Sequence, residues 1–104
     1  MKNKIPNYYR DARLNKLAFK AEQDLNIPNA SFRLIMLLIR ERQTDTKNPV
    51  TTPFPLSDAM AAKLLGKSPK HCYSIIKNLT LGYLFFVEKK GCPATNWYRL
   101  AILE

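Results

Sequence analysis

Apolar residues near the start of the chain recur at the spacing of one helix face. At about 100° per residue they fall on a single stripe, and lysine and arginine side chains of the same segment lie opposite. The stripe consists of Leu14, Leu17, Ala18, Ala21 and Leu25. The pattern predicts an amphipathic helix from about Asp11 to Asn26, which ends before Pro28 because proline does not continue a helix. Residues 1–8, with Lys2 and Lys4, are expected to form a basic arm in front of it.

The next segment predicts a helix of a different kind, from Ala30 to about Gln43, with Asn29 as its N-cap. Its apolar side chains spread around nearly the whole circumference and comprise Phe32, Leu34, Ile35, Met36, Leu37, Leu38 and Ile39. A helix that is apolar all round must be covered on several sides. We therefore expect it either at the centre of the core or shared with a second subunit in a homodimer.

A polar loop containing three prolines follows. The β-branched residues 50–52 predict a short edge strand, since a proline comes directly after them. Ser57 is then predicted to cap a short helix from Asp58 to Leu65, and Gly66 to end that helix at the C-cap.

Ser68 and Pro69 predict that another helix starts at once and runs to about Leu81, where Gly82 ends it. Two short helices joined by a tight glycine-containing turn form a helix-turn-helix. The segments YLFFVEKK and NWYRLAIL, separated by GCPAT, predict a β-hairpin. The expected fold class is therefore α+β and mainly helical, a winged helix-turn-helix with an additional N-terminal helix and a C-terminal hairpin wing. We expect a basic arm and helix over residues 1–28 and a winged-helix domain over residues 29–104.

The helix predicted over residues 68–81 has two contrasting faces. One face is apolar and consists of Cys72, Ile75, Ile76 and Leu79. The outward face has cations and hydrogen-bonding groups but no carboxylate, and consists of Lys70, His71, Tyr73, Ser74, Lys77 and Asn78. This composition suits a major groove, and the helix start at Ser68 suits a phosphate. A solvated helix face without a partner has the same appearance.

Two lysines, Lys89 and Lys90, stand just before the predicted hairpin turn. A cationic hairpin tip beside a helix-turn-helix favours contact with the DNA backbone. The alternative is an edge strand that its charges protect from pairing with another strand.

The overall charge supports a polyanionic partner. The 104 residues, a length typical of one domain, contain 17 Lys and Arg against 8 Asp and Glu, which gives a formal net charge of +9. Double-stranded DNA is the partner that this charge and the outward helix face favour together.

Catalytic, metal and cofactor sites are not indicated. The chain has one histidine, His71, and two cysteines, and it lacks a glycine-rich phosphate loop or a nucleophile motif. Cys72 falls on the apolar face and is expected to be buried, whereas Cys92 falls in the hairpin turn. The sequence therefore predicts a protein that is not an enzyme and has no cofactor. Without an apolar run of membrane-spanning length, it also predicts no membrane contact and a cytoplasmic location.

The segment PFPLSDAMAAKLLGKSPKHCYSIIKNLTLGYL, together with the later NWYRL, resembles a known family. It is similar to the winged helix-turn-helix domains of phage and plasmid replication initiators and replisome organisers, and more loosely to MarR-like regulators. The matching positions include Ser57, Leu65-Gly66, Ser68 and Gly82-Tyr83-Leu84. The family often has arginine where this chain has His71, Tyr73 and Ser74, so base preference does not transfer.

The resemblance implies a DNA-binding regulator or accessory factor of a plasmid, phage or other mobile element, acting in replication, partition or transcription. The expectation of a homodimer comes from the apolar second helix alone. Two alternatives remain open. One is a protein–protein module that docks on a protein of the replication machinery. The other is a single-stranded nucleic-acid binder that stacks bases on its aromatic rings, although we expect most of these rings to fill the core. They are Tyr73, Phe85, Phe86, Trp97 and Tyr98.

Overall fold

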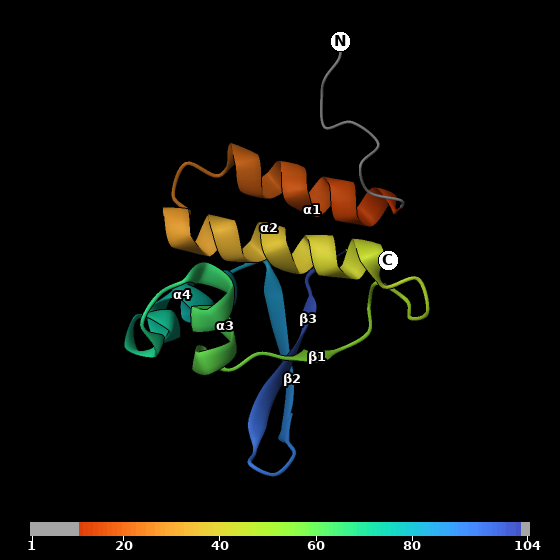
Figure 1. The fold of residues 1–104 in the computed structure, drawn as a ribbon. Coiled ribbons are helices and arrows are strands. Elements are labelled where there is room, and N and C mark those ends of the chain that lie inside the picture. Colours follow the sequence, from red (N-terminus) through yellow and green to blue (C-terminus); the bar gives the residue numbers. More distant parts are fainter. Residues whose placement is uncertain (1–10, 103–104) are drawn as a thin grey trace.

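The computed structural model describes residues 11–102, so the predicted basic arm lies outside the described residues (Figure 1). Within these residues the α-helices are α1 (Ala12–Gln23), α2 (Asn29–Thr44), α3 (Asp58–Leu65) and α4 (Cys72–Leu79), and a 3₁₀ turn, η1 (Pro69–His71), precedes α4. The strands β1 (Phe54–Pro55), β2 (Leu84–Lys90) and β3 (Thr95–Leu100) form an antiparallel sheet in the order β1-β3-β2. The chain is thus an α+β domain in which about half of the described residues are helical, as predicted at this level.

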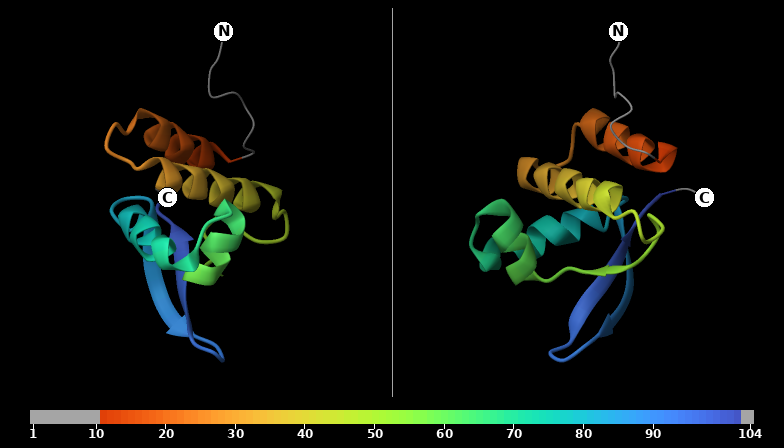
Figure 2. Two further views of the ribbon diagram at one scale, coloured as in Figure 1. Left: turned by 60° about the vertical axis from the view of Figure 1, so that its left-hand side comes forward. Right: turned by 45° about the vertical axis from the view of Figure 1, so that its right-hand side comes forward.

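Helix α2 lies at the centre of the molecule. It packs against α1, α3 and α4, and α1 runs along the side of α2 that faces away from the sheet (Figures 1 and 2). Its fully or nearly fully buried apolar side chains are Leu34, Ile35, Leu38 and Ile39. The expectation of a central helix is confirmed within a single copy of the chain, where α1, α3 and α4 supply the cover. The division of the chain at residue 28 stays a prediction.

Helix α1 has the predicted buried stripe but ends earlier than expected. Leu14, Leu17, Ala18 and Ala21 are buried, whereas Leu25 is 96% exposed, so its place in the stripe was wrong. The reason is Asp24, whose carboxylate accepts a hydrogen bond of 2.9 Å from the backbone N–H of Asn26 and so turns the chain out of the helix.

The predicted caps of α3 are confirmed. The Ser57 hydroxyl accepts a hydrogen bond from the backbone N–H of Met60 at 3.1 Å, and Gly66 ends the helix with a positive φ of 67°. A positive φ favours glycine because it has no Cβ to collide with the backbone.

One predicted strand and the bounds of two predicted helices were wrong. Residues 50–52 form a turn, in which the Thr52 N–H donates to the Pro49 carbonyl at 3.0 Å, and the edge strand is β1 instead. Helix α2 starts at Asn29, with Pro28 in the cap position and no capping side chain. The helix predicted over residues 68–81 begins as the 3₁₀ turn η1, in which Ser68 makes no side-chain cap, and α4 ends at Leu79. There the Thr80 hydroxyl donates to the Lys77 carbonyl at 2.6 Å.

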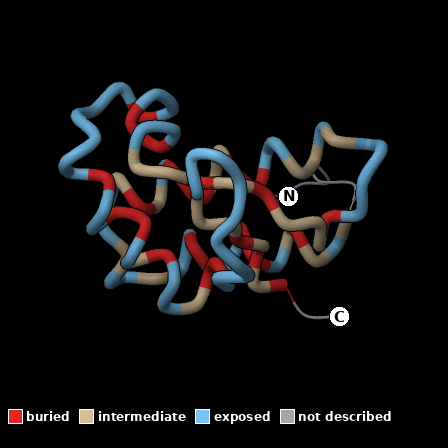
Figure 3. Tube along the Cα trace, turned by 90° about the horizontal axis from the view of Figure 1, so that it is seen from below, coloured by how far each residue is buried: buried red, intermediate tan, exposed pale blue. Residues whose placement is uncertain are grey.

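Strands β2 and β3 form the predicted hairpin, which projects away from the helices (Figure 1). In β3 and just after it, Tyr98, Leu100 and Ile102 are buried and alternate with half-buried residues, as the period of two predicted. Strand β2 is exposed from Phe85 onwards, so the outer part of the hairpin is open to solvent (Figure 3). A register shift between Phe86 and Glu88 leaves Val87 as the extra residue of a bulge.

A buried hydroxyl ties α2 to α4. Ser31 is fully buried and donates a hydrogen bond of 3.1 Å to the backbone carbonyl of Ile75. Among the described residues, and leaving the tyrosines aside, Ser31 is the one polar residue that is buried in the core. The bond fixes α4 on α2 at one point along both helices.

We expect Ser31→Ala to lower the free energy of unfolding by about 1 kcal/mol, because a buried hydrogen bond is lost while the Ile75 carbonyl stays in the core. Urea denaturation followed by circular dichroism measures this change. The control is Ser74→Ala, at an exposed position of α4, where we expect less than about 0.5 kcal/mol. Equal effects of the two substitutions would contradict a stabilising role for the Ser31 hydroxyl.

A second side-chain hydrogen bond joins the start of the hairpin to the end of α1. The Tyr83 hydroxyl donates to the Asp24 carboxylate at 2.7 Å, and Tyr83 is buried. This bond, the Asn26 N–H and the nearby Lys20 together hold the pKa of Asp24 below its ordinary value of 3.8, against the opposing effect of burial. Burial and the bond to Asp24 raise the pKa of Tyr83.

A carboxyl whose pKa is lowered by folding contributes stability that is present above its unfolded-state pKa and is lost as the pH falls through its folded-state pKa. Tyr83→Phe is therefore expected to be less stable than the parent at about pH 7, and the difference is expected to shrink well below pH 3.8. Thermal unfolding at the two pH values measures it. Tyr98→Phe is the control, because the Tyr98 hydroxyl contacts the Asn96 amide rather than a carboxylate. The same pH trend in both variants would show that Asp24 is not the cause.

Candidate nucleic-acid interface

The outward face of η1 and α4 is open to solvent. Cys72, Ile75, Ile76 and Leu79 are buried, which confirms the predicted apolar face. On the other face Asn78 is half-buried, and the exposed residues are Lys70, His71, Tyr73, Ser74 and Lys77. Tyr73 is 62% exposed although it is a large aromatic residue. The packing of α4 thus leaves its cations and hydrogen-bonding groups available for a ligand.

This part of the chain has no acidic residue to neutralise its lysines. No Asp or Glu occurs between Asp58 and Glu88, a stretch that contains Lys63, Lys67, Lys70 and Lys77. The positive potential of η1 and α4 is therefore not cancelled by acidic neighbours in sequence.

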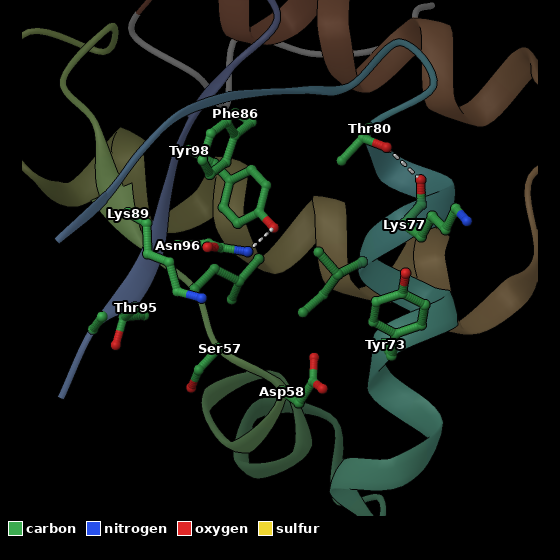
Figure 4. Close-up of a pocket in the computed structure, with 13 residues that line it drawn as sticks. Ser57, Asp58, Tyr73, Lys77, Thr80, Phe86, Lys89, Thr95, Asn96 and Tyr98 are labelled. Atoms are coloured by element: carbon green, nitrogen blue, oxygen red, sulfur yellow. Dashed lines mark hydrogen bonds between the residues drawn. The ribbon is translucent and has the colours of Figure 1, made fainter.

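A groove of about 470 Å³ separates α4 from the hairpin (Figure 4). Helix α4 forms one wall, strands β2 and β3 form the other, and the start of α3 lies at one end. The polar and aromatic side chains around it include Asp58, Tyr73, Lys77, Phe86, Lys89 and Asn96. We call this feature the α4–hairpin groove.

The groove brings together three of the residues that the sequence singled out. Tyr73 and Lys77 line it from α4, with the Lys77 ammonium 5.8 Å from the centre of the Tyr73 ring, and Lys89 lines it from β2. The other candidates lie outside its lining: Ser68, Lys70, His71, Ser74, Asn78 and Lys90. Ser68, Lys70 and His71 are exposed and lie just before α4, in η1 or directly before it.

The two hairpin lysines do not act as a pair. Lys89 lines the groove, whereas the Lys90 ammonium lies 4.3 Å from the centre of the Trp97 ring and 3.3 Å from the Glu88 carboxylate. Successive residues of a strand point to opposite faces. Lys90 therefore belongs to the other face of the sheet.

The structure also adds residues that sequence reasoning did not assign to a duplex site. Asn96 comes from the hairpin, Thr80 and Asp58 come from the ends of two helices, and Phe86, named from the sequence only as a possible stacking ring, comes from β2. Their side chains meet in one place only because the strands fold back beside α4. For Phe86 the alternating pattern of the strand was a usable signal, because it separates Phe86 from Phe85.

The expectation that most of the aromatic rings fill the core was wrong. Tyr98 is buried and Trp97 is half-buried, but Tyr73, Phe85 and Phe86 are exposed. Phe85 and Phe86 lie on β2, which projects from the helices, so their neighbours cover these rings only in part.

Other chemistry has little support among the described residues. Cys72 is buried, and its burial raises the pKa of the thiol, which keeps it protonated and weakly nucleophilic. Cys92 is exposed. Residues 11–102 contain no cluster of three side chains suited to hold a metal ion. None of the described helices combines the length and the apolar character that a bilayer crossing requires.

Comparison with protein-family models, with curated proteins and with solved structures finds no match to this chain.

Proposed function

We propose that the protein binds double-stranded DNA as a winged helix-turn-helix, with η1 and α4 in the major groove and the β2–β3 hairpin beside the adjacent backbone. The observation that carries this proposal is the exposed, cationic and carboxylate-free face of η1 and α4. It lies beside a groove whose far wall adds Lys89. Such a face matches the acceptors of base edges and the negative phosphates next to them.

The arrangement of elements supports the winged-helix assignment. Helices α3 and α4 follow each other through the turn at Gly66, and the hairpin comes directly after α4. The sheet order β1-β3-β2 places the return strand between the short edge strand and β2. The likeness of residues 53–84 to winged-helix segments of replication proteins is the other support.

Each part of the surface has a role in the proposal. Lys77 and Lys89 line the groove from α4 and from β2 and contact phosphates, and Tyr73 contacts either a phosphate or a base. Lys70 and His71 approach the duplex at the start of the helix, and Ser74 and Asn78 are available for base edges. Phosphate contacts supply affinity, and base contacts supply specificity.

The biological role follows from the family resemblance. We propose a regulator or accessory factor of a plasmid, phage or other mobile element, acting on DNA in the cytoplasm. Whether it serves replication, partition or transcription depends on the DNA site. The homodimer stays a prediction, and α2 gives it no support, because other helices of the same copy cover its apolar side chains.

Lys77→Ala is expected to weaken binding to duplex DNA and to make the slope of log affinity against log salt less steep by about 0.9, because one phosphate contact is lost. Fluorescence anisotropy with a labelled duplex at several salt concentrations measures both effects. The matched control is Lys47→Ala, which removes the same charge from an exposed loop outside the groove. If the two variants lose the same affinity and the same slope, only net charge matters and the proposed interface is wrong.

Asp58→Asn is expected to move binding and stability in opposite directions. Its carboxylate lines the groove and repels phosphate, so its removal should tighten binding to duplex DNA. The same carboxylate lies in the first turn of α3, where it stabilises the helix by about 0.3–1 kcal/mol. Anisotropy and thermal unfolding of this variant test the two effects separately. Weaker binding by a folded Asp58→Asn protein would place the DNA elsewhere.

A further inference from the structure

The face of the sheet opposite the α4–hairpin groove carries a second set of aromatic and cationic side chains. In the register of the hairpin, Phe86 is opposite Tyr98 and Phe85 is opposite Arg99. Phe86 and Tyr98 line the groove. Because neighbouring residues of a strand point to opposite faces, Phe85 and Arg99 lie on the other side of the sheet.

Rings and cations are paired on this outer face. The Arg99 guanidinium lies 4.8 Å from the centre of the Phe85 ring, and the Lys90 ammonium lies 4.3 Å from the centre of the Trp97 ring. Phe85 is still 46% exposed. Trp97 and Arg99 are two positions apart on β3, so the two ring–cation pairs follow each other along the strand at about 7 Å.

A hollow of about 320 Å³ continues this face towards α1. Apolar side chains, with Phe85 among them, form its floor, and Arg13, Lys16 and Lys20 stand around it from α1. We call the whole surface the outer strip; it consists of Arg13, Lys16, Lys20, Phe85, Lys90, Trp97 and Arg99.

The outer strip is suited to an anion. Its five cations outnumber the carboxylates near them, which are Asp11 beside Arg13, Glu88 beside Lys90 and Asp24 near Lys20. The excess charge favours a ligand that combines negative groups with flat apolar groups. The rings and the apolar floor would contact the flat groups, and the cations would contact the negative ones.

We propose that the outer strip binds single-stranded nucleic acid. Unpaired bases stack on the exposed parts of Phe85 and Trp97 and on the Arg99 guanidinium, while Lys16 and Lys90 contact the phosphates. Single strands are bound in this way by basic surfaces that also carry aromatic rings, because every base offers a π face. A duplex hides its base faces inside the stack. A second copy of this chain would bring like charges together.

The proposal concerns a surface separate from the groove, and it does not depend on duplex binding there. A protein with both surfaces would hold a duplex on one side of its hairpin and an unpaired strand on the other. That arrangement suits a junction where a duplex has been opened.

Trp97 provides the readout, since it is the one tryptophan of the chain. Titration with an oligothymidylate is expected to quench its fluorescence to saturation. Polyglutamate, which has negative charge but no bases, is expected to bind more weakly and to leave the fluorescence nearly unchanged. No quenching by the oligothymidylate, or binding of polyglutamate that is at least as tight, would overturn the proposal; the latter result would assign the strip to acidic proteins.

A matched pair of variants tests the stacking. Phe85→Leu and Phe86→Leu each remove one exposed ring from β2, on opposite faces of the sheet. Phe85→Leu is expected to weaken oligothymidylate binding about tenfold, the loss that corresponds to one stacked base. Phe86→Leu is expected to leave it within about twofold. Equal losses in the two variants, or no loss in Phe85→Leu, would contradict the assignment.

A charge reversal keeps the test valid if Phe85→Leu does not fold. Lys16→Glu changes an exposed side chain of the strip, and Lys47→Glu changes the same charge in a remote exposed loop. The first is expected to weaken oligothymidylate binding several-fold more than the second. Lys77→Ala, which belongs to the groove, should weaken oligothymidylate binding no more than Lys47→Ala does, whereas it should weaken duplex binding more than Lys47→Ala does. Failure of the outer strip and failure of the duplex proposal are therefore distinguishable.

Discussion

The packing of α4 against α2 is the interaction on which the rest of the structure depends. Four apolar residues of α4 are buried, and each large apolar side chain that leaves water stabilises the fold by about 1.5–3 kcal/mol. The hydrogen bond from Ser31 to the Ile75 carbonyl adds a directional contact at the same interface. Because one face of α4 is held in the core, its cationic face has to point outwards.

Acidic and basic side chains are unevenly distributed over the protein, and for the binding of a polyanion this distribution matters more than the total charge. In α1 and in the loop after α2, acidic side chains bond their neighbours, as Asp11 bonds Arg13 and Asp45 bonds Asn48. No such carboxylate occurs within η1 and α4. An excess of cations on one face attracts a polyanion.

The hairpin connects the two proposals because it divides the surface. Phe85 and Phe86 are neighbours in sequence, yet one faces the hollow beside α1 and the other faces the groove beside α4. Lys89 and Lys90 are separated in the same way. The tie between Tyr83 and Asp24 holds the start of the hairpin against α1 and so keeps both faces in place.

Local rules were enough for the parts of this protein that depend on near neighbours. The apolar face of α4, the Ser57 and Gly66 caps and the alternation of Tyr98, Leu100 and Ile102 all follow from helix and strand periods and from turn chemistry. Tertiary contacts decided the rest. Leu25 is exposed because Asp24 bonds to Asn26 and to Tyr83, a residue far along the chain. The groove and the outer strip exist because the register of β2 on β3 and the position of α1 bring distant residues together, and no pattern of neighbouring residues specifies such distances.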